Sequence, residues 1–308
     1  MRRHERMHAD EIESDVSLVR RLLAEQFPRW AHLPIERFPS EGTANAIYRL
    51  GDRMAVRLPN QPGKGAQLDK EHVWLPKLAP HLPLAIPEPL ARGAPAEGYS
   101  LDWSVYRWLE GENGTLDRLS DPVAAARELA GFIRALQRID PSAGPVPGPH
   151  NFHRGVPHAA RDAGTRRAIG SSNGLVDPGA VTAAWETDLH APAWNGPPRW
   201  IHGDLGPGNL LALEGRLHAV IDWGGLGVGD PAGDLLPAWN LFDGPSRDSF
   251  REALAVDDDT WARGRGLALS IGIVALPYYL DTNPALVRWA RTMIDAVLAD
   301  HERRAWTR

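Results

Sequence analysis

Four polar side chains that could do chemistry stand close together in the stretch WIHGDLGPGNLLALEGRLHAVIDWGGLGVGDPAGDL, residues 200–235. His202, Asp204 and Asn209 lie in a Gly- and Pro-rich loop after a short apolar segment, and Asp222 ends the next apolar run. A carboxylate in an exposed loop can meet a substrate hydroxyl. An amide and a second carboxylate offer the oxygen ligands that Mg²⁺ prefers. These residue types indicate a site that holds a divalent cation against a phosphate.

The spacing narrows this chemistry to phosphoryl transfer. The loop reads H-x-D-x-x-x-x-N, the catalytic-loop spacing of protein kinases, and the metal-binding Asp of kinases also follows on the next apolar run. We predict a hairpin over residues 210–221, which brings Asn209 and Asp222 together at its open end. A single loop Asp or Asn is usually a cap or turn residue, but three at this spacing favour a functional site. We interpret His202 as a structural residue that holds the loop.

The first elements that we expect to position this site are two strands in the N-terminal part of the chain. Apolar side chains alternate over residues 46–58, which predicts two strands joined at a Gly-Asp turn. Because strand side chains alternate between faces, Ala55 and Arg57 share the face opposite to the apolar residues. The polar loop before these strands, residues 40–45, begins at Ser40 and could approach a phosphate; a plain turn is the alternative.

A helix predicted over residues 65–79 carries an acid, Glu71, inside a stripe of leucines at spacings of three and four. Burial of a carboxylate is costly unless a cation pairs with it. Arg57 is the lone charge on the face of residues 54–58 that it shares with Ala55. If this inner face meets the helix, Arg57 can pair with Glu71, and we predict this ion pair. A Glu71 that stays exposed at the helix edge is the alternative.

The rest of the N-terminal part is mixed in pattern. Residues 14–27 predict a helix with Ser14 or Asp15 as its N-cap. Residues 83–89 and 100–109 predict further strand-like pieces.

A break in the pattern at residues 110–114 marks a lobe boundary. Beyond it, Asp-Pro pairs at positions 121 and 177 begin helices, and residues 257–301 predict helices broken at Pro277 and Pro284. We therefore predict an α+β fold with a small β-rich N-terminal lobe, residues 1–110, and a larger, mainly helical C-terminal lobe, residues 111–308. The arginine-rich run at 151–174 is interpreted as solvated surface; arginines that reach an anionic group on the substrate are the alternative.

Composition excludes several other classes of protein. The chain has 308 residues, a net charge of −5 and no cysteine, so nucleic-acid binding, disulfides and zinc–thiolate sites are not expected. The first residues mix charges and do not resemble a secretory signal. The longest apolar run, residues 267–280, is too short for a membrane span and fits a buried helix. We expect a soluble, cytoplasmic protein that binds no membrane.

Six segments make the sequence similar to the aminoglycoside phosphotransferase family, the kinase-like enzymes that phosphorylate small molecules. The segments are IHGDLGPGNLL, VIDW, GDPAGDL, MAVRLP, KEHVWLP and VYRWLEGE. The resemblance implies a bilobal protein-kinase-like fold with ATP or GTP in the cleft and with Mg²⁺. It implies that Asp204 is the catalytic base, that Asn209 and Asp222 hold Mg²⁺, and that Asp234 braces the catalytic loop from a helix start.

The same resemblance assigns the nucleotide to the N-terminal lobe. The implied contacts are Ser40, Ala55, Arg57, Glu71, Tyr106, Trp108 and Leu109. Residues 106–109 would form the hinge that faces the adenine. Arg57 replaces the family's strand lysine, and a planar guanidinium is not equivalent to an ammonium.

The acceptor is expected to be a small polar molecule, because residues 223–229 leave no room for the activation loop of a protein kinase. Residues 230–302 hold 12 acidic and 6 basic side chains, and an acidic rim suits a polycationic acceptor such as an aminoglycoside-like antibiotic. A solvated helix start is the alternative for the triplet at 257–259. An amino sugar, a macrolide or peptide antibiotic, a choline-like metabolite, and a catalytically silent nucleotide-binding protein remain open. We expect a monomer or a homodimer.

Overall fold

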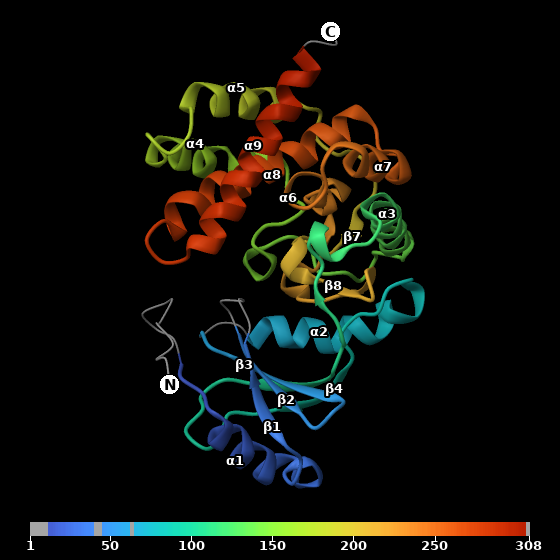
Figure 1. Cartoon of the computed structure of the whole chain (residues 1–308), viewed down its shortest axis with the longest axis vertical. Helices are drawn as coiled ribbons and strands as arrows, with labels where there is room; N and C mark the ends of the chain where they lie inside the picture. The colour runs from blue at the N-terminus through green and yellow to red at the C-terminus, as the bar shows by residue number, and fades with distance from the viewer. Residues whose placement is uncertain (1–11, 40–44, 62–64, 306–308) are drawn as a thin grey trace. The chain divides into compact units, whose positions relative to one another are not determined.

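The computed structural model describes residues 12–39, 45–61 and 65–305, and its contacts divide the chain after Gly111 into two compact units (Figure 1). The first unit also takes in Ala219–Ile221, and the second holds the rest of the chain from Glu112. The first is built on an antiparallel sheet and the second is mainly helical, so the predicted α+β class is confirmed. No helix within these described ranges is long and apolar enough to cross a membrane.

The first unit is a sheet with one helix on each face (Figure 1). Its elements are α1 (Val16–Gln26), β1 (Ile35–Phe38), β2 (Asn45–Leu50), β3 (Met54–Pro59), α2 (Gly65–Leu78), β4 (Pro89–Gly93) and β5 (Trp103–Arg107). The five strands are antiparallel in the order β1-β2-β3-β5-β4. Asp15 caps α1 as predicted, because its carboxylate accepts a hydrogen bond of 2.7 Å from the backbone N–H of Leu18.

Sequence reasoning missed or misplaced two strands of this sheet. The strand β1 was not predicted, since Ile35 is its single buried residue and the apolar alternation is absent. Most of residues 83–89 form no ladder; Ala85 makes an isolated bridge with Ala219, and β4 begins only at Pro89.

The two faces of the sheet carry different side chains. On one face, leucines of α1 pack against apolar residues of the strands, including Tyr48, Val56 and Trp103. Alternate residues of β3 and β5 point to the other face, toward α2, and among them are Arg57 and Tyr106. Strand alternation therefore separates an apolar core from a polar cluster within one small sheet.

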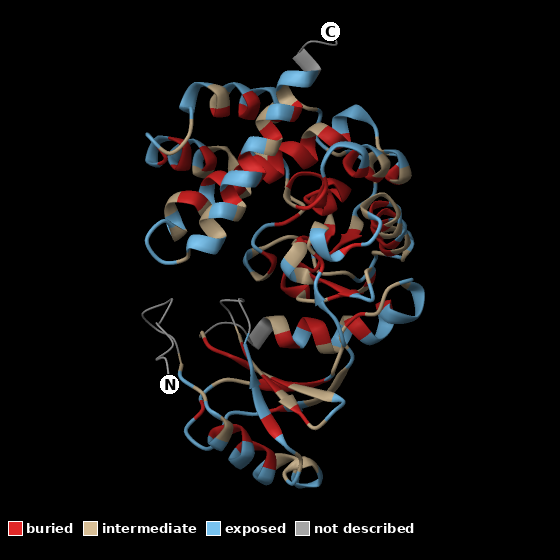
Figure 2. Ribbon diagram, viewed as in Figure 1, coloured by how far each residue is buried: buried red, intermediate tan, exposed pale blue. Residues whose placement is uncertain are grey.

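The second unit contains most of the helices. They are α3 (Pro122–Arg138), α4 (Asp162–Ser171), α5 (Pro178–Leu189), α6 (Pro237–Asn240), α7 (Gly244–Leu254), α8 (Asp258–Tyr279) and α9 (Pro284–Ala305). Much of α8 is buried among the others (Figure 2). The helix starts predicted at Asp121-Pro122 and Asp177-Pro178 are confirmed. The break predicted at Pro277 is wrong: the residue lies inside α8, which ends two residues later, whereas Pro284 is the first residue of α9.

The segment 151–174 is only partly the solvated surface that its composition suggested. It includes the helix α4, and Arg166 and Arg167 are exposed, whereas Arg154 is buried and Arg161 is half-buried. Composition did not reveal that Arg161 is half-buried, because its partner lies in a distant element: it donates to Ser270 Oγ, 109 residues away.

Short strands flank the loop that carries Asp204. They are β6 (Glu112–Asn113), β7 (Arg199–Ile201), β8 (Leu210–Leu213), β9 (Arg216–Val220) and β10 (Gly227–Gly229). β7 pairs with β10, and β8 pairs with both β6 and β9. The predicted hairpin is confirmed; Glu214 and Gly215 form its two-residue turn with φ of 51° and 77°, the conformation that tight hairpins require. Asn209 and Asp222 therefore flank its open end.

Candidate active site

The buried side chain of Asp234 holds the loop that follows β7. Asp234 accepts hydrogen bonds of 2.9 Å from the backbone N–H of His202 and 2.7 Å from that of Gly203. It is fully buried, and burial raises its pKa to about 7, while the two N–H groups act in the opposite direction. The bracing role predicted for Asp234 matches this geometry, although the residue ends a 3₁₀ helix (Pro231–Asp234) instead of beginning a helix.

His202 is a structural residue in this arrangement, as we predicted. Its side chain is completely buried, and the ring packs edge-to-face on Trp223 with 4.8 Å between ring centroids. The Nδ1 atom accepts a hydrogen bond of 3.2 Å from the backbone N–H of Asp204. Because Nδ1 accepts, the neutral ring carries its proton on Nε2.

Asp204 and Asn209 are in contact within the loop. The Asn209 amide nitrogen donates to the Asp204 carbonyl oxygen at 2.7 Å and lies 3.3 Å from Asp204 Oδ2. This turns the carbonyl oxygen of the same amide away from Asp204. The Asp204 side chain is 46% exposed, so a substrate can reach its carboxylate.

Asp222 follows β9 in a conformation that few residues adopt. Its φ of 56° and ψ of 75° lie in the left-handed region, which Asp tolerates better than most residues. Its carboxylate lies 3.4 Å from the backbone N–H of Gly224 and helps to begin the next 3₁₀ turn. A non-glycine residue with positive φ is often found at functional sites.

The polar cluster of the first unit is centred on Glu71. The predicted ion pair with Arg57 is present, because Arg57 Nη1 lies 2.9 and 2.8 Å from the two carboxylate oxygens. Gln67 donates to the same carboxylate at 3.0 Å, and the Tyr106 hydroxyl donates at 2.5 Å. Glu71 is 1% exposed, so the exposed alternative is wrong.

The other residues expected to contact the nucleotide differ in position. Ala55 pairs with Tyr106 across the sheet, and the Tyr106 hydroxyl points at Glu71; burial raises the pKa of this phenol well above its ordinary value. Trp108 and Leu109 follow β5, and Arg49 stacks over the Trp108 ring at 4.8 Å. Ser40 lies outside the described residues. Contact of these side chains with a nucleotide stays a prediction.

One residue at the site was missed by sequence reasoning. Arg154 Nη2 lies 3.5 Å from Asp204 Oδ1, from a loop 50 residues upstream. The residue is 9% exposed, and burial lowers its pKa while the Asp204 carboxylate acts in the opposite direction. The run of arginines was visible in the sequence, but nothing in it distinguished the one that reaches Asp204.

The acidic rim predicted for the acceptor is partly engaged in the fold. Asp230 pairs with Arg263 at 2.7 Å, and Asp258 pairs with Arg251. Asp257 caps α8 through the backbone N–H of Thr260 at 2.6 Å. Asp257 and Asp258 therefore fit the alternative of a helix start. The excess of acidic residues is a weak argument for a polycationic acceptor.

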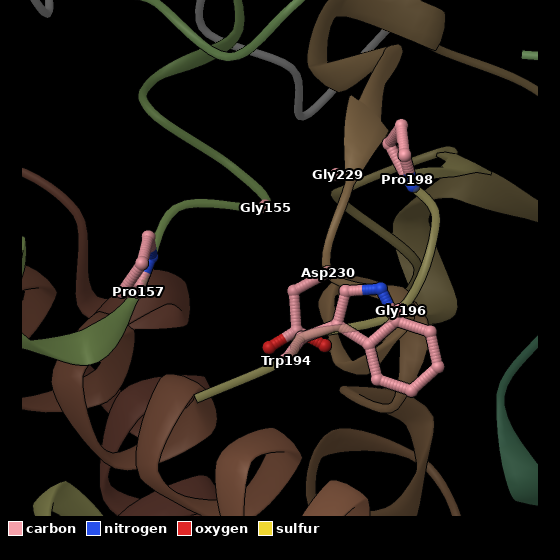
Figure 3. Close-up of a pocket in the computed structure, with 7 residues that line it drawn as sticks. All are labelled: Gly155, Pro157, Trp194, Gly196, Pro198, Gly229 and Asp230. Atoms are coloured by element: carbon pink, nitrogen blue, oxygen red, sulfur yellow. The ribbon is translucent and has the colours of Figure 1, made fainter. Parts of the chain in front are cut away.

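A small pocket in the second unit has a volume of about 160 Å³ (Figure 3). Its lining residues are Gly155, Pro157, Trp194, Gly196, Pro198, Gly229 and Asp230. Its one ionisable side chain, Asp230, is the partner of Arg263. Pro198 precedes β7 and Asp204 follows it, so the pocket and the Asp204 carboxylate belong to opposite ends of that strand.

A family model described as the phosphotransferase enzyme family matches residues 35–267, which include every described site residue above. The chain belongs to the phosphotransferase enzyme family. Membership assigns it to the enzymes of phosphoryl transfer. It is also 28% identical over 169 residues to the uncharacterized protein YcbJ of Bacillus subtilis (strain 168); the match covers 53% of this chain, which spans about half (51%) of that relative.

Solved structures of similar fold come from antibiotic kinases. The GDP complex of wild-type aminoglycoside 2'-phosphotransferase-IIIa is 18% identical, with a TM-score of 0.72 over 94% of this chain and 100% of that one. Macrolide 2'-phosphotransferase MphH from Brachybacterium faecium is 22% identical, with a TM-score of 0.61 over 91% and 98%. These likenesses establish the kinase-like fold of the family.

Proposed function

We propose that this protein is an ATP- or GTP- and Mg²⁺-dependent O-phosphotransferase that acts on a hydroxyl of a small molecule. The observation that carries the proposal is the braced loop. Asn209 bonds to a half-exposed Asp204, and Asp234 holds the loop through the backbone N–H groups of the two residues before Asp204. Phosphoryl transfer needs a positioned carboxylate near the acceptor hydroxyl and little other covalent chemistry from the protein. Asp204 is the base in this proposal.

Asn209 and Asp222 are the proposed Mg²⁺ ligands. Among the described residues, no group of three or more His, Cys, Asp or Glu side chains could hold a metal ion. This fits Mg²⁺, which often takes one or two protein ligands and completes its shell with phosphates and water. When bound with the nucleotide, the ion would neutralise charge on the phosphates.

Arg57 is the proposed contact to the nucleotide phosphates, and Glu71 holds it in place. Two hydrogen bonds, of 2.9 and 2.8 Å, join one terminal nitrogen of Arg57 to the Glu71 carboxylate and fix the orientation of the guanidinium. Solved relatives of similar fold are described as complexes with GDP or ADP, which supports a nucleotide in this role.

The acceptor is proposed to be an antibiotic-like molecule that carries hydroxyl groups. Structural relatives are described as complexes with kanamycin or streptomycin, and others as macrolide phosphotransferases. Because several acidic residues near α8 pair with arginines or cap the helix, charge alone does not favour the aminoglycoside over the macrolide. The acceptor panel below therefore includes both.

Transfer of labelled γ-phosphate from ATP and from GTP to aminoglycosides, macrolides, amino sugars and choline tests the proposal. We expect transfer to at least one acceptor, dependent on Mg²⁺. Asp204→Ala should lower turnover by about 10²-fold or more, while calorimetric titration with Mg-ATP remains close to wild type. Asp117→Ala, at an exposed site of the same unit, is the matched control and should be fully active. Nucleotide binding without transfer to any acceptor would favour the catalytically silent alternative.

A further inference from the structure

Arg154 is a buried cation beside Asp204 with few hydrogen bonds of its own. Nη2 is 3.5 Å from Asp204 Oδ1, which is longer than a good hydrogen bond. The Nε atom is buried and has no hydrogen-bond partner among the described residues. A buried charge that is poorly satisfied destabilises a fold, so stability does not explain why an arginine stands here.

The segment that delivers Arg154 is held in an unfavourable backbone conformation. Phe152 and His153 have φ of 55° and 54°, in the left-handed region that costs an L-residue about 1–2 kcal/mol. The side chain of Asn151, completely buried, accepts from the Gly148 N–H at 3.0 Å and donates to the Arg154 carbonyl at 3.1 Å. Strain that the surroundings enforce in this way is typical of functional segments.

The catalytic loop is shaped to receive Arg154. Gly203, immediately before Asp204, has φ of +82°, and a Cβ at this position would lie 3.1 Å from Arg154 Cβ and 2.7 Å from the Gly225 carbonyl oxygen. On the other side, the Asp230 N–H donates to the Gly155 carbonyl at 3.1 Å and anchors the end of the segment. The residue that follows the arginine is therefore fixed to the end of β10, the strand that pairs with β7.

We propose that Arg154 is a positioning residue for phosphoryl transfer, which holds the Asp204 carboxylate from the Oδ1 side while Asn209 holds it from the Oδ2 side. This rests on the proposed function of Asp204. In the step that it serves, the acceptor oxygen bonds to the γ-phosphorus and the acceptor proton passes to Asp204. The bond from that phosphorus to the bridging oxygen breaks, and its electron pair leaves with the nucleoside diphosphate. A fixed carboxylate keeps the acceptor hydroxyl in line for this attack.

The test replaces Arg154 by Met, which is uncharged and of similar length. We expect kcat to fall about 10²-fold, with KM for Mg-ATP within about 3-fold, because the interaction lies on the acceptor side and serves the transition state. We expect the melting temperature to stay the same or to rise, since removal of a poorly paired buried charge is often neutral or stabilising. Arg154→Lys keeps a charge without the planar fork and should recover part of the lost kcat.

Two further variants make each outcome decisive. Arg166→Met is the matched control, because its guanidinium is 43% exposed in the same segment and pairs with surface acids; it should have wild-type kinetics. If Arg154 acts through Asp204, the Asp204→Asn/Arg154→Met double variant is no slower than Asp204→Asn alone.

The outcomes that overturn the inference differ from those that overturn the proposed function. Wild-type kcat in Arg154→Met, or a loss of kcat that follows a lowered melting temperature and is not rescued by Lys, shows that Arg154 has at most a structural role. Fully additive effects in the double variant show that it does not act through Asp204. If Asp204→Asn itself keeps full activity, the assignment of the base is wrong instead.

Discussion

Removal of Arg57 should destabilise the first unit far more than removal of a surface arginine. Glu71 is 1% exposed and accepts hydrogen bonds from Arg57, Gln67 and Tyr106, of which only Arg57 is charged. Arg57→Met therefore leaves an uncompensated buried carboxylate, at a cost of about 3–5 kcal/mol. At about 2–4 °C for each kcal/mol, the melting temperature should fall by roughly 10 °C.

The compensating change is Glu71→Gln. In the Arg57→Met/Glu71→Gln variant the buried charge is gone and the amide oxygen still accepts from Tyr106, so most of the lost stability should return. Mg-ATP affinity should not return, because the proposed phosphate contact is absent. Recovery of stability without recovery of Mg-ATP affinity would separate the structural role of this pair from its role in nucleotide binding.

Urea unfolding followed by circular dichroism measures the free energy of unfolding of each variant. Hydrogen exchange of amides in α2 and β3 reports the first unit separately. Arg21→Met is the matched control, because its 2.9 Å pair with Glu97 is 49% and 37% exposed and such pairs contribute about 0–1 kcal/mol. The reasoning is refuted if Arg57→Met costs no more than this control, or if Glu71→Gln fails to restore stability.

Three further predictions concern the second unit and its loop. Gly203→Ala should lose activity and at least about 2 kcal/mol of stability. The control Gly98→Ala has the same φ of +82° with open space around it, so it should lose only the stability that the left-handed backbone costs an alanine. Activity in Gly203→Ala would contradict this prediction. Burial raises the pKa of Asp234 from 3.8 to about 7, so the folded state binds a proton that the unfolded state lacks, and wild-type stability should fall as pH rises through this window. Urea unfolding at pH 5, 6 and 7 should show a decline of up to about 1.4 kcal/mol per unit relative to Asp234→Asn, and a rise would reverse the sign of the argument. Asp121→Ala removes the cap of α3 and should cost about 1 kcal/mol in thermal unfolding, with an unchanged melting temperature as the contrary result.

Local features of the fold were readable because they depend on neighbours in sequence. The periods of 3.6 and 2 residues predicted α1, α3 and the β2–β3 pair, and cap and Pro signals placed the start of α5 at its observed residue. Pro277 misled this reasoning, because a long buried helix packed on its neighbours tolerates a proline near its end. Strand β1 gave little signal because a single side chain of it is buried.

The sequence alone predicted phosphoryl transfer for the central loop, because Asp204, Asn209 and Asp222 lie on one loop and one hairpin; the hairpin and the contact of Asp204 with Asn209 are present in the structure. It also determined the pairing of Arg57 with Glu71, since a buried acid demands a cation and one stood on the facing strand. The family resemblance implied that Asp234 braces the loop, and the structure shows the two hydrogen bonds that do so from 31 and 32 residues away. Only the tertiary structure decided that Arg154 reaches Asp204 across 50 residues. Such contacts depend on how distant elements pack and on positive φ angles at Phe152 and His153, which neither periodicity nor residue type announces.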